Sequence, residues 1–149
     1  MRILIQRVLN ASVTIDNTVT GEINHGLLLL VGITHADTEA TEDRMVEKII
    51  KLRIFSDENG KMNTSVIDVG GGILAVSQFT LYADAKNGNR PSYTNAARPE
   101  QASPAFDRFV AKLAQRAGKP VPTGVFGAAM KVALINDGPV TIWLDSVEI

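Results

Sequence analysis

Two short apolar runs most limit what this chain can fold into. Residues 26–33 are apolar throughout and contain glycine at both ends, and Ile73, Leu74 and Val76 form a second run. Apolar runs of this length with polar flanks are typical of strands that are covered on both faces. The sequence therefore predicts buried strands at the centre of a sheet.

Shorter strands surround these runs. Residues 3–8 and 12–16 predict two strands, the second half-exposed because polar and apolar side chains alternate along it. Asn17-Thr18 offers a turn, after which residues 19–23 return as a hairpin partner. Near the other end, residues 129–135 and 140–147 predict two further strands, which flank Gly138-Pro139.

Two helices complete the pattern. The first follows Thr38 or Thr41 as N-cap, and apolar residues recur along it at three- and four-residue spacing. The second is expected to begin with Ser103 as cap and Pro104 at the first position, and to close before Gly118. No repeat or linker interrupts residues 1–149, so we predict one α/β domain.

Composition narrows the function. The formal net charge is −1, which argues against bulk electrostatic binding of nucleic acid and requires a local basic patch instead. Cysteine is absent, which excludes disulfides and thiolate chemistry. The apolar run at the N-terminus is too short for a signal peptide, and no stretch approaches the ~20 residues of a membrane helix. We expect a cytoplasmic protein.

Polar residues end the second apolar run. Ser77, Gln78 and Thr80 place two hydroxyls and an amide where the strand surfaces. Buried hydroxyls and amides are costly unless paired. This segment therefore either belongs to a hydrogen-bond network or lines a site.

Standard hydrolase groups are missing. There is no nucleophile-elbow motif, and His25 and His35 are the only histidines. His35 with Asp37 provides two ligands, which do not make a metal site. We predict no metal and no cofactor, and interpret Glu42 and Asp43 as acidic residues that favour a helix N-terminus.

Two motifs give the chain a resemblance. Ser77-Gln78-Phe79-Thr80-Leu81 and Asn136-Asp137-Gly138-Pro139-Val140-Thr141 resemble the paired signatures of the D-aminoacyl-tRNA deacylases, also called D-tyrosyl-tRNA deacylases. Matching features run from Ile5-Gln6-Arg7-Val8 to the last strand. The resemblance implies a homodimer of mostly antiparallel, barrel-like sheets with two main helices packed on them. It also implies hydrolysis of D-aminoacyl-tRNA to free amino acid and tRNA.

The resemblance also implies a site. Ser77, Gln78, Phe79 and Thr80 would be catalytic, and a cis Gly138-Pro139 would reach the partner's site as a filter that rejects L-aminoacyl groups. Arg7 would hold this filter, and Phe126 and Met130 would line the substrate pocket. Glycine has no Cβ to reject, so glycyl-tRNA, including glycine mischarged on alanine tRNA, is an expected substrate.

The chemistry has two possible forms. Backbone N–H groups at residues 77–80 could stabilise an oxyanion while the 2′-hydroxyl of the terminal ribose orients water. Alternatively, Thr80 acts as nucleophile, which requires an adjacent base that the sequence does not show. The first form is favoured on that ground. The preferred D-amino acid stays open.

Basic residues in the loop at 83–101 are the expected tRNA contacts: Lys86, Arg90 and Arg98. A second possibility is the group Arg108, Lys112 and Arg116 on the second helix. The alternative function is a non-catalytic nucleic-acid-binding module of the same fold, and a dimeric small-ligand binder is a third.

Overall fold

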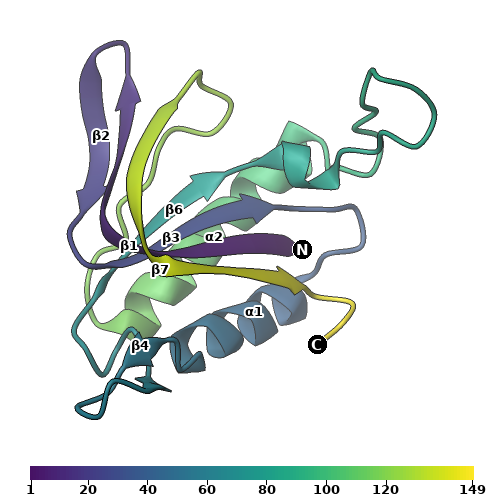
Figure 1. Cartoon of the computed structure of the whole chain (residues 1–149). Coiled ribbons are helices and arrows are strands. Elements are labelled where there is room, and N and C mark those ends of the chain that lie inside the picture. The colour runs from purple at the N-terminus through teal and green to yellow at the C-terminus, as the bar shows by residue number, and fades with distance from the viewer.

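The computed structural model describes residues 1–149 as one α/β domain (Figure 1). Its strands are β1 (Arg2–Ile15), β2 (Thr18–Ile23), β3 (Gly26–Gly32), β4 (Phe55–Ser56), β5 (Met62–Thr64), β6 (Gly72–Ser77) and β7 (Lys131–Asp145). Its helices are α1 (Glu39–Lys51), the 3-10 helix η1 (Phe79–Tyr82) and α2 (Pro99–Ala117). Neither α-helix is long and apolar enough to span a membrane.

The main sheet is five-stranded and mixed. Strand β1 pairs antiparallel with β2 and β3 along one edge and with β7 along the other, and β6 extends the sheet parallel to β3. The sheet curls, so that β2 and parts of β1 and β7 rise away from the two helices (Figure 1). The predicted mostly antiparallel, barrel-like sheet with two helices is confirmed, except that it closes only into a half-barrel and contains one parallel pair.

The parallel pair of β3 and β6 depends on two glycines. Gly26 faces Gly72 in the register, and a Cβ on Gly26 would lie 2.0 Å from the carbonyl oxygen of Gly72. Only residues without a Cβ allow such an approach at this point. The glycines that bound the predicted central strand therefore have a packing role.

Alternate residues of the buried strands face two separate cores. Leu27 and Leu29 pack toward α1 and α2 with a cluster of 24 buried residues, which includes Phe106 and Phe109. Leu28 points the other way, into a six-residue cluster inside the curl of the sheet. This division explains the unbroken apolar run, because both faces of β3 are covered.

Helix α1 begins as predicted. Thr38 is its N-cap: its hydroxyl accepts from the Thr41 N–H, and the Thr41 hydroxyl accepts from the Thr38 N–H, so both candidate residues take part in one capping box. Apolar residues of α1 then pack on the sheet.

Helix α2 begins earlier than predicted. Its N-cap is Arg98 and Pro99 takes the first position, so the prediction of Ser103 as cap is wrong. Pro104 lies inside the helix on its exposed side. Pro104 removes the helical partner of the Glu100 carbonyl, and Glu100 is itself an exposed residue, so the proline is tolerated. The predicted end before Gly118 is confirmed, with Gly118 at φ 70°.

Two pairs of predicted strands are single strands. Residues 2–15 form one strand because β7 continues to pair with them past Val8. Residues 131–145 also form one strand, so the prediction of two separate strands on either side of Gly138-Pro139 is wrong. The chain passes through Gly138-Pro139 without reversing direction.

Glu42 joins the two helices. Its carboxylate is 1% exposed and accepts hydrogen bonds from Arg108 Nη2 at 2.8 Å and Lys112 Nζ at 3.1 Å. Hydrogen bonding to Glu42 raises the pKa of Arg108 above its usual value. Glu42 is therefore a buried structural anion, and not merely an acidic residue near a helix end.

We expect Glu42→Gln to lower the free energy of unfolding by about 2 kcal/mol, because hydrogen bonds to charged groups are each worth roughly 1.5–3 kcal/mol. Urea denaturation measures this. Asp43→Asn is the matched control, since Asp43 is exposed and shares only Lys112; it should cost less than about 1 kcal/mol. Equal losses of unfolding free energy in Glu42→Gln and Asp43→Asn would show that the burial of Glu42 adds nothing to stability.

Candidate active site

A cavity of about 240 Å³ opens at the end of β6. Its lining is mostly apolar and combines four parts of the chain, namely the end of β3, residues 76–79 at the end of β6, the start of α2, and residues 126–132. Of the predicted site residues, it brings together Ser77, Gln78, Phe79, Phe126 and Met130. This is the natural place for a small, partly apolar group with a few polar contacts.

The polar segment leaves the sheet at Ser77. The Gln78 N–H donates to the Val31 carbonyl at 2.7 Å, and the chain then turns into η1. Thr80 thus lies on a short helix rather than on the expected strand end. Phe79 and Thr80 begin η1, so their N–H groups have no acceptor within it. These two donors are free to meet a substrate oxygen beside the cavity.

The Thr80 hydroxyl has an amide partner. Gln78 Nε2 donates to Thr80 Oγ1 at 2.5 Å. No histidine, lysine or carboxylate makes a hydrogen bond with Thr80. The single chain therefore supplies no base next to this hydroxyl.

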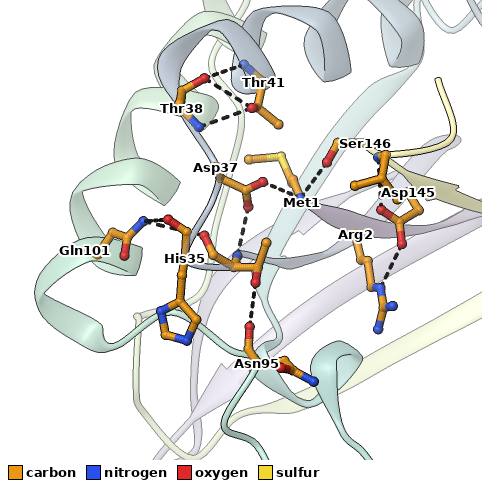
Figure 2. A network of polar contacts seen from close by, with 12 residues as sticks. Met1, Arg2, His35, Asp37, Thr38, Thr41, Asn95, Gln101, Asp145 and Ser146 are labelled. Atoms are coloured by element: carbon orange, nitrogen blue, oxygen red, sulfur yellow. Dashed lines mark hydrogen bonds and ion pairs between the residues drawn. The ribbon is translucent and has the colours of Figure 1, made fainter.

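Arg2 holds η1 against the sheet. Its guanidinium donates to the Leu81 carbonyl at 3.0 Å and pairs with Asp145 of β7 at 2.9 Å, a pair that Figure 2 shows. It also lies over the ring of Tyr82, at 4.5 Å from the centroid. Burial raises the pKa of the Tyr82 hydroxyl far above its usual value, with Asp37 and Asp145 adding to the effect. No sequence pattern predicted this role of Arg2, since an arginine near a chain end usually lies in water.

A bulge in β7 carries Gly138-Pro139. Pairing of β1 with β7 jumps from Gln6↔Thr141 to Val8↔Asn136, so that residues 137–140 stand opposite Arg7 alone. The Gly138-Pro139 peptide bond is cis, Gly138 has φ 127°, and both residues are exposed.

Side chains of the same motif close the bulge. Asn136 Oδ1 accepts from the Val140 N–H at 3.0 Å, and its Nδ2 donates to Thr141 Oγ1 at 2.9 Å. The asparagine side chain replaces ladder hydrogen bonds that the bulge removes. This role of Asn136 and Thr141 was missed from the sequence, although both stand in the motif.

Arg7 fixes the bulge from below. It donates to the Asp137 carbonyl at 3.1 Å and to the Ile54 carbonyl at 2.7 Å, and it pairs with the Asp137 carboxylate at 3.3 Å. A Cβ on Gly138 would lie 2.9 Å from Arg7 Nη2. The structure therefore places Arg7 directly behind Gly138.

The two motifs lie apart in one chain. None of the residues that line the cavity belongs to 136–141, and Gly138-Pro139 projects to the surface. The chain by itself brings Phe126 and Met130 to the Ser77–Phe79 segment, and brings Arg7 to Gly138-Pro139, but does not join the two groups.

The histidines lie outside the cavity. His25 Nε2 is 3.8 Å from the Asp137 carboxylate, and His35 Nε2 contacts the Thr94 carbonyl at 2.8 Å. Asp37 is not a partner of His35, because its carboxylate accepts from the Met1 ammonium group at 2.5 Å (Figure 2).

The candidate basic residues fall into two groups. Arg108, Lys112 and Arg116 form ion pairs with Glu42, Asp43 and Glu47 of α1. Lys86 and Arg90 lie in the exposed loop after η1 and form no ion pair, while Arg98 lies 3.7 Å from Glu100. Of these six residues, only Lys86 and Arg90 form no ion pair and are free for an anionic partner.

The fold and site define a family of hydrolases. The sequence profile described as D-Tyr-tRNA(Tyr) deacylase matches residues 4–145. A D-aminoacyl-tRNA deacylase of Chromobacterium violaceum is 62% identical over 146 residues, which cover 98% of this chain and 97% of that protein. A D-aminoacyl-tRNA deacylase of Thermomicrobium roseum is 58% identical over 149 residues, which cover 100% of this chain and 96% of that protein. The chain belongs to the D-Tyr-tRNA(Tyr) deacylase family, as the two motifs predicted.

Solved structures agree on the fold. A c-Myc DNA unwinding element binding protein superposes with a TM-score of 0.91 at 41% identity, covering 97% of this chain and 98% of that one. A probable eukaryotic D-amino acid tRNA deacylase superposes with a TM-score of 0.81 at 16% identity, covering 96% and 97%. The second likeness concerns the fold alone.

We expect Gly138→Ala to destabilise the protein, because its Cβ would collide with Arg7 Nη2 and with Val140 Cγ2, both at 2.9 Å. The φ of 127° adds a cost of roughly 1–3 kcal/mol for a residue other than glycine. Urea denaturation measures the total loss of unfolding free energy in Gly138→Ala. Gly88→Ala is the matched control, since Gly88 has φ 107° and open space around its Cα.

A double-mutant cycle isolates the collision. In an Arg7→Ala background the penalty of Gly138→Ala should shrink, while that of Gly88→Ala should not change. Additive losses from Arg7→Ala and Gly138→Ala would contradict direct packing of Arg7 against Gly138.

Proposed function

We propose that this chain hydrolyses the ester bond of D-aminoacyl-tRNA as a homodimer. Each site would combine the cavity and the Ser77–Thr80 segment of one protomer with Gly138-Pro139 of the other. The observation that carries this proposal is that one chain holds both motifs in ordered form, yet places Gly138-Pro139 on its surface and outside its own cavity.

Exposed apolar side chains on the edge strand β7 and on β1 support a second copy. Ile135 is 52% exposed and Trp143 is 44% exposed, one on each side of the bulge along β7. Leu9 of β1, next to the Asn10↔Ile135 pair, is also half-exposed. Large apolar side chains that stay exposed near a protruding main-chain element suit a symmetric interface, in which each protomer offers the same residues.

The filter would act through main chain. Carbonyl oxygens of Gly138 and Pro139 would accept from the substrate ammonium group, and an L side chain would collide with this backbone. Arg7, tied to Asp137 and Ile54, makes the backbone rigid enough to exclude rather than yield. Because no side chain of the substrate is read in detail, one site would accept many D-amino acids.

Hydrolysis would need little from side chains. An aminoacyl ester is already activated, and the N–H groups of Phe79 and Thr80 could bind the oxyanion; such donors are worth roughly 3–4 kcal/mol each. Ser77 and Gln78 would hold this segment in place, and the 2′-hydroxyl of the terminal ribose would orient the water. The amide partner of Thr80 supports this form of the reaction over a nucleophilic threonine.

The pocket would take the end of the tRNA. Phe126 and Met130 line the apolar part of the cavity, where the terminal adenine would lie. Lys86, Arg90 and Arg98 would contact phosphates of the same strand. We place the reaction in the cytoplasm, where aminoacyl-tRNA is made and used.

A second candidate function has one observation in its favour. The structurally similar protein at 41% identity is described as a DNA unwinding element binding protein. A chain of this fold could accordingly bind nucleic acid without catalysis. The experiment below separates the two functions.

The protein should deacylate D-tyrosyl-tRNA and glycyl-tRNA, including glycine mischarged on alanine tRNA, and leave L-tyrosyl-tRNA essentially intact. The reason is that only the L residue presents a Cβ to the Gly138-Pro139 main chain. Release of amino acid from matched charged tRNAs measures this. Cleavage of D- and L-tyrosyl-tRNA at equal rates would refute the filter, refusal of glycine would show positive recognition of a D side chain, and cleavage of none would favour the binding module.

We expect Thr80→Val to retain activity within roughly tenfold, because losing the hydroxyl removes one hydrogen bond worth about 1 kcal/mol. Substrate that ends in 2′-deoxyadenosine should be cleaved poorly by wild type. Single-turnover rates with both substrates measure this. An inactive but folded Thr80→Val protein that leaves the deoxy substrate fully reactive in wild type would instead identify Thr80 as the nucleophile.

We expect the double variant Lys86→Gln, Arg90→Gln to weaken tRNA binding and flatten its salt dependence. Each lost phosphate contact removes roughly 0.7–0.9 from the slope of log affinity against log salt. The control is Lys48→Gln, Lys51→Gln on α1, which removes the same charge from a different surface. Equal slopes of log affinity against log salt in the two double variants would show that Lys86 and Arg90 do not contact the tRNA phosphates.

A further inference from the structure

Phe79 and Tyr93 form an exposed aromatic pair at the rim of the cavity. Their ring centroids are 5.0 Å apart and the ring planes meet at 71°. Phe79 is 55% exposed although it also lines the cavity, and Tyr93 is 38% exposed. Two large rings that hold each other in place while facing solvent are unusual in a chain of only 5% aromatic residues.

The backbone around Tyr93 is firmly held. Asp84 and Ser92 exchange two backbone hydrogen bonds of 2.8 Å, which close the loop that carries Lys86 and Arg90. On the other side, the Thr94 carbonyl contacts His35 Nε2 at 2.8 Å. The Asn95 carbonyl accepts from Thr34 Oγ1 at 2.6 Å (Figure 2). Tyr93 is therefore a fixed part of the surface.

The loop next to this pair is electropositive. Lys86 and Arg90 form no ion pair, and in Figure 1 their loop extends from η1 away from the body of the domain. Flat aromatic rings with free cations beside them are the elements from which single-stranded nucleic acid sites are built, since bases stack on the rings and phosphates meet the cations.

We infer that the Phe79–Tyr93 pair binds the base of the penultimate nucleotide of the tRNA, with the Tyr93 ring stacked on the base and Phe79 holding Tyr93 in place. This inference rests on the proposed function, which places the ester and the terminal adenosine in the cavity. The strand must then leave over the rim, where Phe79 lies, and continue toward Lys86 and Arg90. A base at that point meets the aromatic pair, and stacking is tolerant of base identity because every base has an aromatic face.

Short substrates test the inference. D-tyrosyl-adenosine lacks the penultimate nucleotide, D-tyrosyl-CpA carries it, and a third substrate has an abasic ribose in place of cytidine. For wild type, kcat/KM should be higher for the CpA ester than for the other two. Tyr93→Leu should reduce kcat/KM for the CpA ester by roughly 5- to 100-fold, the range that base–aromatic stacking covers. Tyr93→Leu should not change kcat/KM for the adenosine ester. Tyr93→Phe should have the wild-type kcat/KM for both the adenosine ester and the CpA ester.

A binding measurement separates this inference from the reaction. A CCA-ended oligonucleotide with pyrrolocytosine at the penultimate position should lose fluorescence on binding wild type and Tyr93→Phe, and not on binding Tyr93→Leu. If wild type cleaves none of the three esters, the proposed function fails, whereas this quenching still decides the stacking.

Three results would overturn the inference. Equal loss on the CpA and adenosine esters in Tyr93→Leu would assign Tyr93 to general support of the cavity. Equal kcat/KM for the CpA and abasic esters in wild type would show that no base is bound at the rim. A change in oligomeric state of Tyr93→Leu, without dependence on substrate length, would show that a second copy of the chain covers the pair.

Discussion

The pairing of β1 with β7 organises this molecule, because β1 is the strand that β2, β3 and β7 all join. The pairing runs through both halves of the sheet and shifts register twice, at Arg7 and at Leu9. Opposite Arg7 the four residues 137–140 leave the ladder, where Arg7 donates to the Asp137 carbonyl and Asn136 accepts from the Val140 N–H. The strand thus presents Gly138-Pro139 at the surface while side chains replace some of the lost ladder hydrogen bonds.

The pair of β1 and β7 also contacts the segment that follows Ser77. Arg2, at the start of β1, connects the Leu81 carbonyl of η1 with Asp145 at the end of β7. The Ser77–Thr80 segment is therefore tied to the strand that carries the bulge, even though the bulge does not reach the cavity of its own chain. In a symmetric dimer this tie would fix the geometry of both composite sites, since each protomer contributes one half to each.

Local patterns predicted much of the fold. The apolar run at 26–33 is β3, Thr38 caps α1, and Gly118 ends α2, because each feature depends on neighbours in sequence. The errors lie where distant residues decide. Residues 9–11 continue β1 because β7 pairs with Asn10 and Ala11, and Glu42 is buried where α2 brings Arg108 and Lys112 to it. The motifs predicted candidate site residues, but the separation of Gly138-Pro139 from the cavity required the three-dimensional structure.

Subunit mixing tests most directly whether the filter acts across a dimer. Ala128→Trp should fill the cavity of one protomer, and Gly138→Ala should disable the filter of the other. Refolded mixtures of these two proteins should regain cleavage specific for D-tyrosyl-tRNA, at about one quarter of the wild-type level, since half of the dimers are mixed and each holds one intact site. A mixture with no more D-specific activity than its two parents would show that each chain filters its own cavity, and would contradict the account.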